Sequence, residues 1–192
     1  EPVLGLLENS TVPMLSPESL LANAYTLLGK QEKAKETMQI SAYQHLLSLI
    51  DGASVFFSLY LDDPDKFEEI VLRTTGLCDL YQVERLHPTI LLSVFLTAAQ
   101  GYCSFGKTEQ AIGMLKRYCS LVQELPAKLE LHGDEFFDLL GNWFETFELG
   151  TLIPRDEKTV RKNITDVVAQ NPAFAPLKQD PRFQSILDKL GA

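Results

Sequence analysis

Residues 21–38 read LANAYTLLGKQEKAKETM, and residues 98–115 read AAQGYCSFGKTEQAIGML. Aligned with an offset of 77 residues, from Gly29 to Gly106, the two stretches share one pattern. A small residue is followed by a tyrosine three positions later, a glycine four positions later, an alanine five positions later and a large apolar residue four positions later. Because an internal repeat is the sequence signature of a stacked architecture, this pattern decides the fold.

Each shared position has a packing role in a pair of antiparallel helices. The small residues let the helices approach, the tyrosines fill the gap between them, and the glycines make the turn. The alanines sit where the second helix crosses the first. We expect the following positions to hold the two pairs together: Leu21, Ala22, Tyr25, Gly29, Ala34, Met38, Ala98, Ala99, Tyr102, Gly106, Ala111 and Leu115.

The pattern resembles the tetratricopeptide repeat, which spaces the same residue types over about 34 residues. The usual tryptophan is replaced by Glu18 in one copy and Phe95 in the other, and the closing proline by Leu46 or Gln123. The resemblance implies an all-α fold, a right-handed superhelical stack of helical hairpins.

The offset of 77 residues is longer than two standard repeats. We therefore expect a degenerate middle pair within residues 48–85. Its predicted core comprises Phe57, Tyr60, Pro64 and Phe67.

Helical periodicity dominates the rest of the chain, and no sustained strand alternation is present. Three helix starts pair a capping side chain with a proline, at Ser16-Pro17, Asp63-Pro64 and Asp180-Pro181. The predicted helices are 17–28, 31–50, 53–61, 64–82, 88–104, 108–124, 134–148, 156–169 and 181–189.

The predicted organisation is a hairpin array over residues 1–125 and a C-terminal helical cap over residues 126–192, packed on the array. In the cap, the helix 134–148 is expected to bury Trp143 in an apolar stripe with Phe136, Leu140 and Phe147.

The net charge of −9, from 26 acidic and 17 basic residues, disfavours phosphate backbones and anionic membranes as partners. No stretch approaches the roughly 20 apolar residues of a membrane span. Cys78, Cys103 and Cys119 lie in apolar helical runs, and we expect buried thiols in a reducing, cytoplasmic compartment rather than a disulfide, metal or reactive site. A chain starting at Glu1 without methionine is expected to be a fragment or a processed product.

Candidate chemistry is sparse. The three histidines, His45, His87 and His132, lack the paired spacing of helical metal ligands, so we expect no metal site. Asp62, Asp63 and Asp65 resemble a calcium loop, but Pro64 explains them as a helix start. No nucleophile elbow, phosphate loop or dinucleotide turn is present, so we expect neither catalysis nor a cofactor.

The resemblance places a ligand groove on the first helix of each pair. Its predicted lining is Ser19, Asn23, Thr26, Leu96, Gln100 and Cys103. Asn23 and Gln100 occupy the same slot, and a carboxamide suits an extended peptide backbone because it both donates and accepts hydrogen bonds. Ordinary polar residues on a wet surface remain the alternative.

Residues 174–186 resemble a closing segment of tetratricopeptide proteins, and the whole chain resembles the repeat half of Cro-type helix-turn-helix regulators of Gram-positive bacteria, the Rgg and PlcR families. This resemblance implies a non-catalytic peptide- or ligand-sensing and oligomerisation domain that binds no nucleic acid itself and can form a homodimer. The alternatives are a stand-alone adaptor that docks a partner protein, and a dimerisation module with an empty groove.

Overall fold

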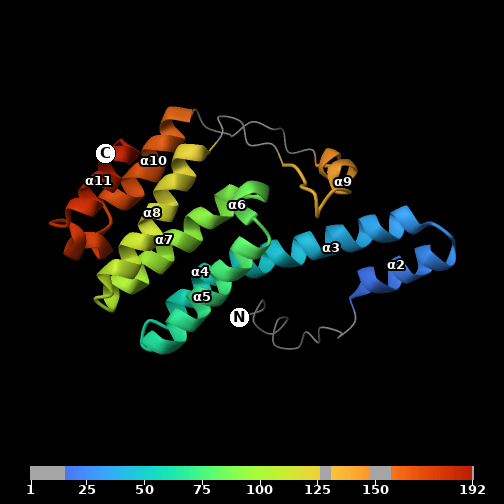
Figure 1. Cartoon of the computed structure of the whole chain (residues 1–192), viewed down its shortest axis with the longest axis horizontal. Helices are drawn as coiled ribbons and strands as arrows, with labels where there is room; N and C mark the ends of the chain where they lie inside the picture. Colours follow the sequence, from blue (N-terminus) through green and yellow to red (C-terminus); the bar gives the residue numbers. More distant parts are fainter. Residues whose placement is uncertain (1–15, 126–130, 148–156, 192) are drawn as a thin grey trace, which may run out of the picture.

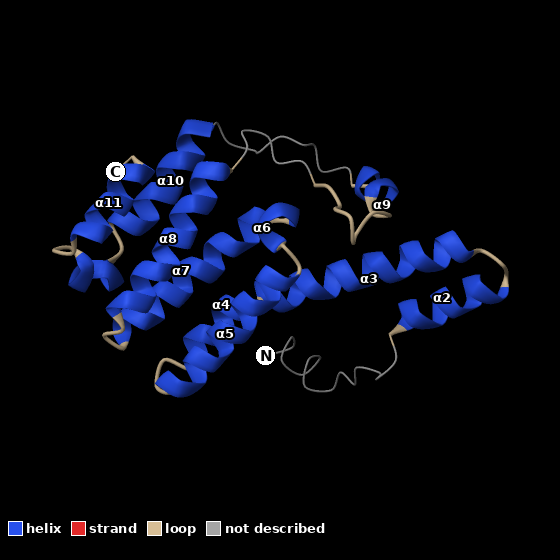
Figure 2. Cartoon of the chain, in the orientation of Figure 1, coloured by secondary structure: helices blue, strands red, loops and turns tan. Residues whose placement is uncertain are grey.

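The computed structural model describes residues 16–125, 131–147 and 157–191. This part of the chain is all-helical, with ten α-helices, one 3₁₀ helix and no strand (Figures 1 and 2). The elements are α2 (Pro17–Leu27), α3 (Gln31–Asp51), α4 (Ala53–Leu59), α5 (Pro64–Leu80), α6 (Val83–Leu86), α7 (Pro88–Ser104), α8 (Thr108–Glu124), α9 (Gly141–Glu145), α10 (Glu157–Ala169), η1 (Pro172–Leu177) and α11 (Pro181–Leu190).

The two copies of the repeat form antiparallel hairpins, α2–α3 and α7–α8, with the same turn. Gly29 has a φ of 69° and Gly106 a φ of 68°, the left-handed conformation that favours glycine. The amide of the next residue donates to the tyrosine carbonyl in both, Lys30 to Tyr25 at 2.8 Å and Lys107 to Tyr102 at 2.9 Å. This hydrogen bond closes a Schellman motif, so the shared spacing corresponds to one shared local structure.

The two copies differ in how far they are buried. Tyr102 is 2% exposed and Leu115 is fully buried, because α3, α4, α8 and η1 all pack on α7 and α11 packs on α8. In the first copy, Tyr25 is only half-buried, and Leu21 and Met38 are 47% and 40% exposed. Among the described helices, α3 is the one that packs on α2, and the hairpin extends away from the other helices (Figure 1).

The expected middle pair is the hairpin α4–α5. Phe57 and Phe67 are both fully buried, and their rings lie 5.7 Å apart. Phe67 also packs edge-on against Tyr102, with a centroid separation of 5.3 Å, which joins this hairpin to α7. Of the other two expected core residues, Tyr60 is half-buried and Pro64 is exposed at the first position of α5, where Asp63 caps the helix.

The C-terminal helices pack on the second hairpin. α11 lies against α8, and η1 lies against α7. The hydroxyl of Tyr118 in α8 donates to the carbonyl of Ile164 in α10 at 3.0 Å. Thr165 of α10 is buried and donates to the carbonyl of Leu190 at 2.8 Å. α10 is therefore tied by hydrogen bonds to both α8 and α11.

The predicted helix 134–148 is wrong for most of its described length. Only Gly141–Glu145 is helical. Of the expected stripe, Leu140 is buried, but Phe136 is 62% exposed and Phe137 is buried in its place. The carboxylate of Asp134 accepts from the amides of Phe136 and Phe137 at 2.9 and 2.8 Å, which holds a turn rather than a helix. Residue 148 lies outside the described residues. The expected burial of Trp143 is met in part, because Trp143 is half-buried against Tyr43.

No helix among the described residues is both long and apolar enough to cross a membrane. The thiols of Cys78, Cys103 and Cys119 are free and buried, as the sequence predicts. Burial raises the pKa of Cys78 and Cys103 to about 11, so these thiols are protonated and unreactive near neutral pH.

Candidate binding groove

The three predicted groove residues of α2 lie on the projecting hairpin. The hydroxyl of Ser19 is 2.8 Å from that of Ser16, the capping residue, and so takes part in starting the helix. The hydroxyl of Thr26 donates to the carbonyl of Ala22 at 3.0 Å. Asn23 is exposed. Of these three side chains, Asn23 is the most accessible to a ligand in solution.

The three predicted groove residues of α7 lie in the centre of the molecule. Leu96 and Gln100 are half-buried and Cys103 is 9% exposed. α7 and α2 make no close packing contact, so the structure does not bring the two triplets together into one surface (Figure 1). The assignment of these six residues to a common groove stays a prediction.

A different hollow runs along α5, and we call it the α5 groove. Its cavity volume is about 410 Å³, within the range of small-ligand sites. It lies between α5 and the junction of α3 with α4. It is lined by Ser48, Leu49, Ile50, Gly52, Ala53, Phe56, Lys66, Glu69, Ile70, Arg73, Thr74 and Leu77.

The groove is apolar because the apolar stripe of α5 extends beyond its fully buried centre. Phe67 and Val71 are fully buried against the core. Ile70, which is 6% exposed, and the half-buried Leu77 form the flank of the stripe and line the groove. From the opposite wall, Phe56 leaves 44% of its surface exposed. Exposed large apolar side chains that converge on one hollow are typical of a binding surface.

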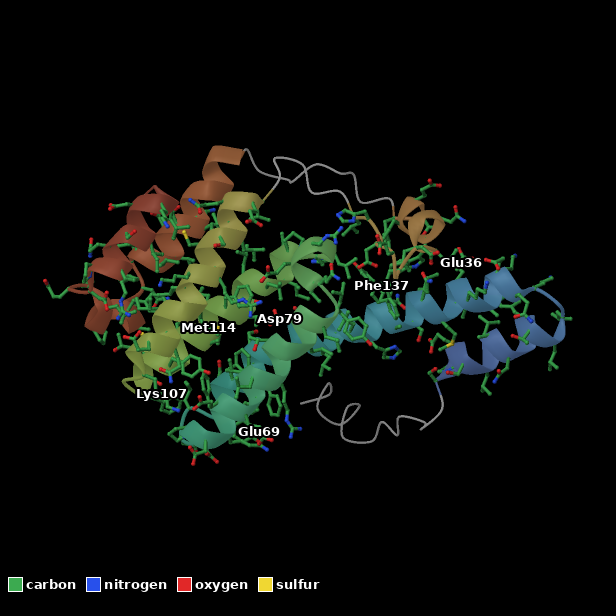
Figure 3. All side chains as sticks on the ribbon, viewed as in Figure 1. Glu36, Glu69, Asp79, Lys107, Met114 and Phe137 are labelled. Carbon is green, nitrogen blue, oxygen red and sulfur yellow. The ribbon has the colours of Figure 1, made fainter. Side chains whose placement is uncertain are left out.

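The rim of the groove is charged. Glu69 accepts from Lys66 at 3.3 Å and from Arg73 at 2.6 Å, and Figure 3 shows Glu69 on α5. The hydrogen bond from Lys66 and the charge of Arg73 hold the pKa of Glu69 below its ordinary value. Two cations and one anion leave this rim with a local excess of positive charge on a chain whose net charge is −9.

A second hollow of about 320 Å³ lies at the C-terminal end of α5. It is lined by Leu80, Tyr81, Gln82, Asp134, Phe136 and Phe137, and Figure 3 shows Phe137 beside α3. Leu80 lies about one helical turn beyond Leu77 on the same side of α5. The α5 residues that line the two hollows run from Lys66 to Leu80, a strip of about 21 Å along the helix.

A polar hollow of about 490 Å³ lies between α8 and α11 and includes Lys116, Arg182 and Lys189. Arg182 is already paired there, with Asp180 at 2.7 Å and Glu109 at 2.7 Å. Hydrogen bonds from Arg182 lower the pKa of Asp180 to about 2. The ion pair between Arg182 and Glu109 joins the start of α11 to α8.

The described residues contain no cluster of three or more histidine, cysteine or acidic side chains with the geometry of a metal site. His45 lies 2.7 Å from the carbonyl of Ser41 and is held within α3. His87 precedes α7, and burial lowers its pKa. His132 is exposed and contacts the carbonyl of Gly133 at 2.9 Å. Each histidine has a local structural partner.

Comparison of the chain with protein-family models, curated proteins and solved structures finds no match.

Proposed function

We propose that this chain is a non-catalytic interaction domain that binds a short apolar peptide in the α5 groove. The observation that carries the proposal is the exposed apolar lining of the two hollows along α5. Leu49 and Phe56 in the α5 groove are 66% and 44% exposed, and Leu80 in the second hollow is 76% exposed. Covering such side chains removes apolar surface from water, at about 25 cal/mol per Å².

The shape of the strip favours an extended peptide. A length of about 21 Å accommodates about six residues at 3.3 Å each. In an extended peptide, every second side chain points in the same direction. Two such side chains could enter the two hollows, one lined by Leu77 and the other by Leu80.

The rim charge favours an acidic group on the peptide. Lys66 and Arg73 share the single carboxylate of Glu69 and keep unused N–H donors. A peptide carboxylate, from an acidic residue or from its C-terminus, can accept from Arg73 in a bidentate manner. We therefore expect the preferred ligand to combine apolar side chains with one carboxylate.

The biological role we propose is that of the sensing half of a bacterial transcription regulator, located in the cytoplasm. The support is the resemblance of the two matched hairpins to tetratricopeptide arrays of the Rgg and PlcR type, which also implies a superhelical stack capped by residues 126–192. A stand-alone adaptor is the alternative role. The complete reading frame of the parent gene distinguishes these two roles, because a regulator also encodes a helix-turn-helix segment beside this array.

Peptide binding is tested by fluorescence polarisation of labelled hexapeptide pools against the purified chain. The pools carry apolar residues at alternate positions and either aspartate or lysine at one end. We expect binding of the aspartate pool to be lost in Leu49→Lys and weakened in Arg73→Glu. Leu72→Lys is the matched control, because Leu72 is 63% exposed on α5 but does not line the groove.

Two outcomes would reject this assignment. Equal losses in Leu49→Lys and Leu72→Lys would mean that the effect is not local to the groove. If Asn23→Ala and Gln100→Ala lost binding while Leu49→Lys kept it, the peptide site would be the groove predicted from the repeat.

A further inference from the structure

α2 carries a stripe of exposed leucines that nothing in the described part of the chain covers. Leu20, Leu21, Leu27 and Leu28 are 60%, 47%, 89% and 68% exposed. α2 packs on α3 through Ala22, the one buried residue of the helix, and this contact lies on a different side of α2. Four neighbouring leucines form an apolar patch that monomeric proteins rarely leave in water.

The stripe is symmetric about Ala24. Leu20 and Leu28 lie four residues on either side of Ala24, and Leu21 and Leu27 lie three residues on either side. An antiparallel helix pair with a two-fold axis at Ala24 therefore brings Leu20 of each copy opposite Leu28 of the other, and Leu21 opposite Leu27. In a two-fold interface the same patch must complement itself, and this arrangement does so.

The centre of the stripe fits the same arrangement. Ala24 on the axis is small, which permits the close approach of two helices at 8–10 Å.

We propose that a second copy of this chain packs on the leucine stripe of α2, antiparallel and with its two-fold axis at Ala24. The α2–α3 hairpin reaches away from the other helices, so two copies can pair through α2 at the end of the molecule (Figure 1). This face is separate from the α5 groove, and the inference does not depend on peptide binding.

The first test is the mass of the full chain by light scattering over a concentration series. We expect a dimer for the wild type and a dissociation constant raised at least about tenfold, or 1.4 kcal/mol, in Leu21→Glu. The double variant Leu21→Glu/Leu27→Lys should restore the dimer, because each glutamate then faces a lysine of the other copy. Leu72→Glu, which changes an even more exposed leucine on α5, is the control that should remain dimeric.

The second test fixes the register. Oxidation of Ala24→Cys should link two copies through a disulfide on the axis, whereas Asn23→Cys, about 100° further round the helix, should not. The three native cysteines are buried and do not compete.

A monomeric wild type at every concentration would overturn the proposal. If Leu21→Glu then also lowered the melting temperature, another part of the same chain would be the cover. A dimer that Leu21→Glu leaves intact, or that links through Asn23→Cys but not Ala24→Cys, would equally reject this interface.

Discussion

Gly101 of α7 and the ring of Phe67 of α5 are packed so closely that a Cβ atom on Gly101 would overlap the ring. Phe67 is fully buried, and its ring packs against those of Phe57, Tyr102 and Phe105, so it cannot shift without disturbing them. We expect Gly101→Ala to lower the free energy of unfolding by about 1–3 kcal/mol, the usual cost of overpacking a core. Urea denaturation followed by circular dichroism measures the change.

Gly113→Ala is the matched control for that substitution. Gly113 also lies inside a helix, α8, but a Cβ there meets no atom within 4 Å. Alanine should therefore stabilise α8 by about 0.5–1 kcal/mol through its higher helix propensity. Opposite signs at the two glycines are the expected result, and a stable Gly101→Ala variant would contradict the observed contact.

We expect Tyr102→Ala and Tyr25→Ala to lower the free energy of unfolding by different amounts, although the repeat alone predicts equal effects. Tyr102 is 2% exposed in the core, so Tyr102→Ala should cost about 3–5 kcal/mol. Tyr25 is half-buried between α2 and α3, so Tyr25→Ala should cost less than about 2 kcal/mol. Equal shifts in melting temperature would show that the first hairpin is packed as firmly as the second.

The hydroxyl of Tyr43 is buried without a hydrogen-bond partner among the described residues. Its ring packs edge-on against Phe137 at 5.5 Å, a contact that phenylalanine can reproduce. Tyr43→Phe should therefore leave stability unchanged or raise it, because an unpaired buried polar group costs about 1–3 kcal/mol. Tyr118→Phe removes a hydroxyl that does have a partner, Ile164, and should lose about 1 kcal/mol. Thermal unfolding of the pair gives the comparison, and a less stable Tyr43→Phe would point to an unseen partner.

Stability should fall in alkali. Burial raises the pKa of the Cys78 and Cys103 thiols from 9.0 to about 11, so the folded chain holds protons that the unfolded chain has lost. The stabilisation is therefore complete below about pH 9 and is lost as the pH rises to about 11. We expect roughly 1–2 kcal/mol of loss for each thiol between pH 8 and about pH 10.5, measured by urea denaturation. The double variant Cys78→Ala/Cys103→Ala should show a flatter profile, and an unchanged slope would exclude the thiols as the cause.

The hairpins were predictable because their determinants are local in sequence. Gly29 and Gly106 set the turn and the following helix within a few residues, and the proline–cap pairs fix the starts of α2, α5 and α11. The burial of each copy was not predictable in this way. The repeat encodes the contact within a pair, whereas the exposure of Leu21 and Met38 depends on which other helices lie nearby.

The segment before α9 shows how a distant residue overrides periodicity. Phe136, Leu140 and Phe147 have helical spacing, but Gln39 of α3 donates to Asp138 at 2.7 Å and accepts from the amide of Leu139 at 2.9 Å. The amide of Leu139 would donate to a backbone carbonyl in a continuous helix, but here it donates to the side chain of Gln39. Since Gln39 is about a hundred residues away in the chain, no local pattern reveals the contact.

The α5 groove was missed for a related reason. Phe67, Ile70, Val71 and Leu77 all match one helical period, so the sequence of α5 indicates a wide apolar stripe without showing that its flank at Leu77 is only half-buried. The width of the apolar stripe on α5 could have indicated the groove, because a helix that only packs on the core needs a narrower stripe.

α3 begins at the hairpin with α2 and ends in the wall of the α5 groove, where Ser48, Leu49 and Ile50 contribute side chains. It is one helix of 21 residues, which spans about 31 Å. A helix of this length acts as a lever: a tilt of about 5° at the groove displaces its opposite end by about 3 Å. Such a displacement is comparable to the helix shifts that switch subunit interfaces between alternative packings. A rearrangement of a few degrees beside Leu49 would therefore move α2 by a distance that a partner bound to α2 would register.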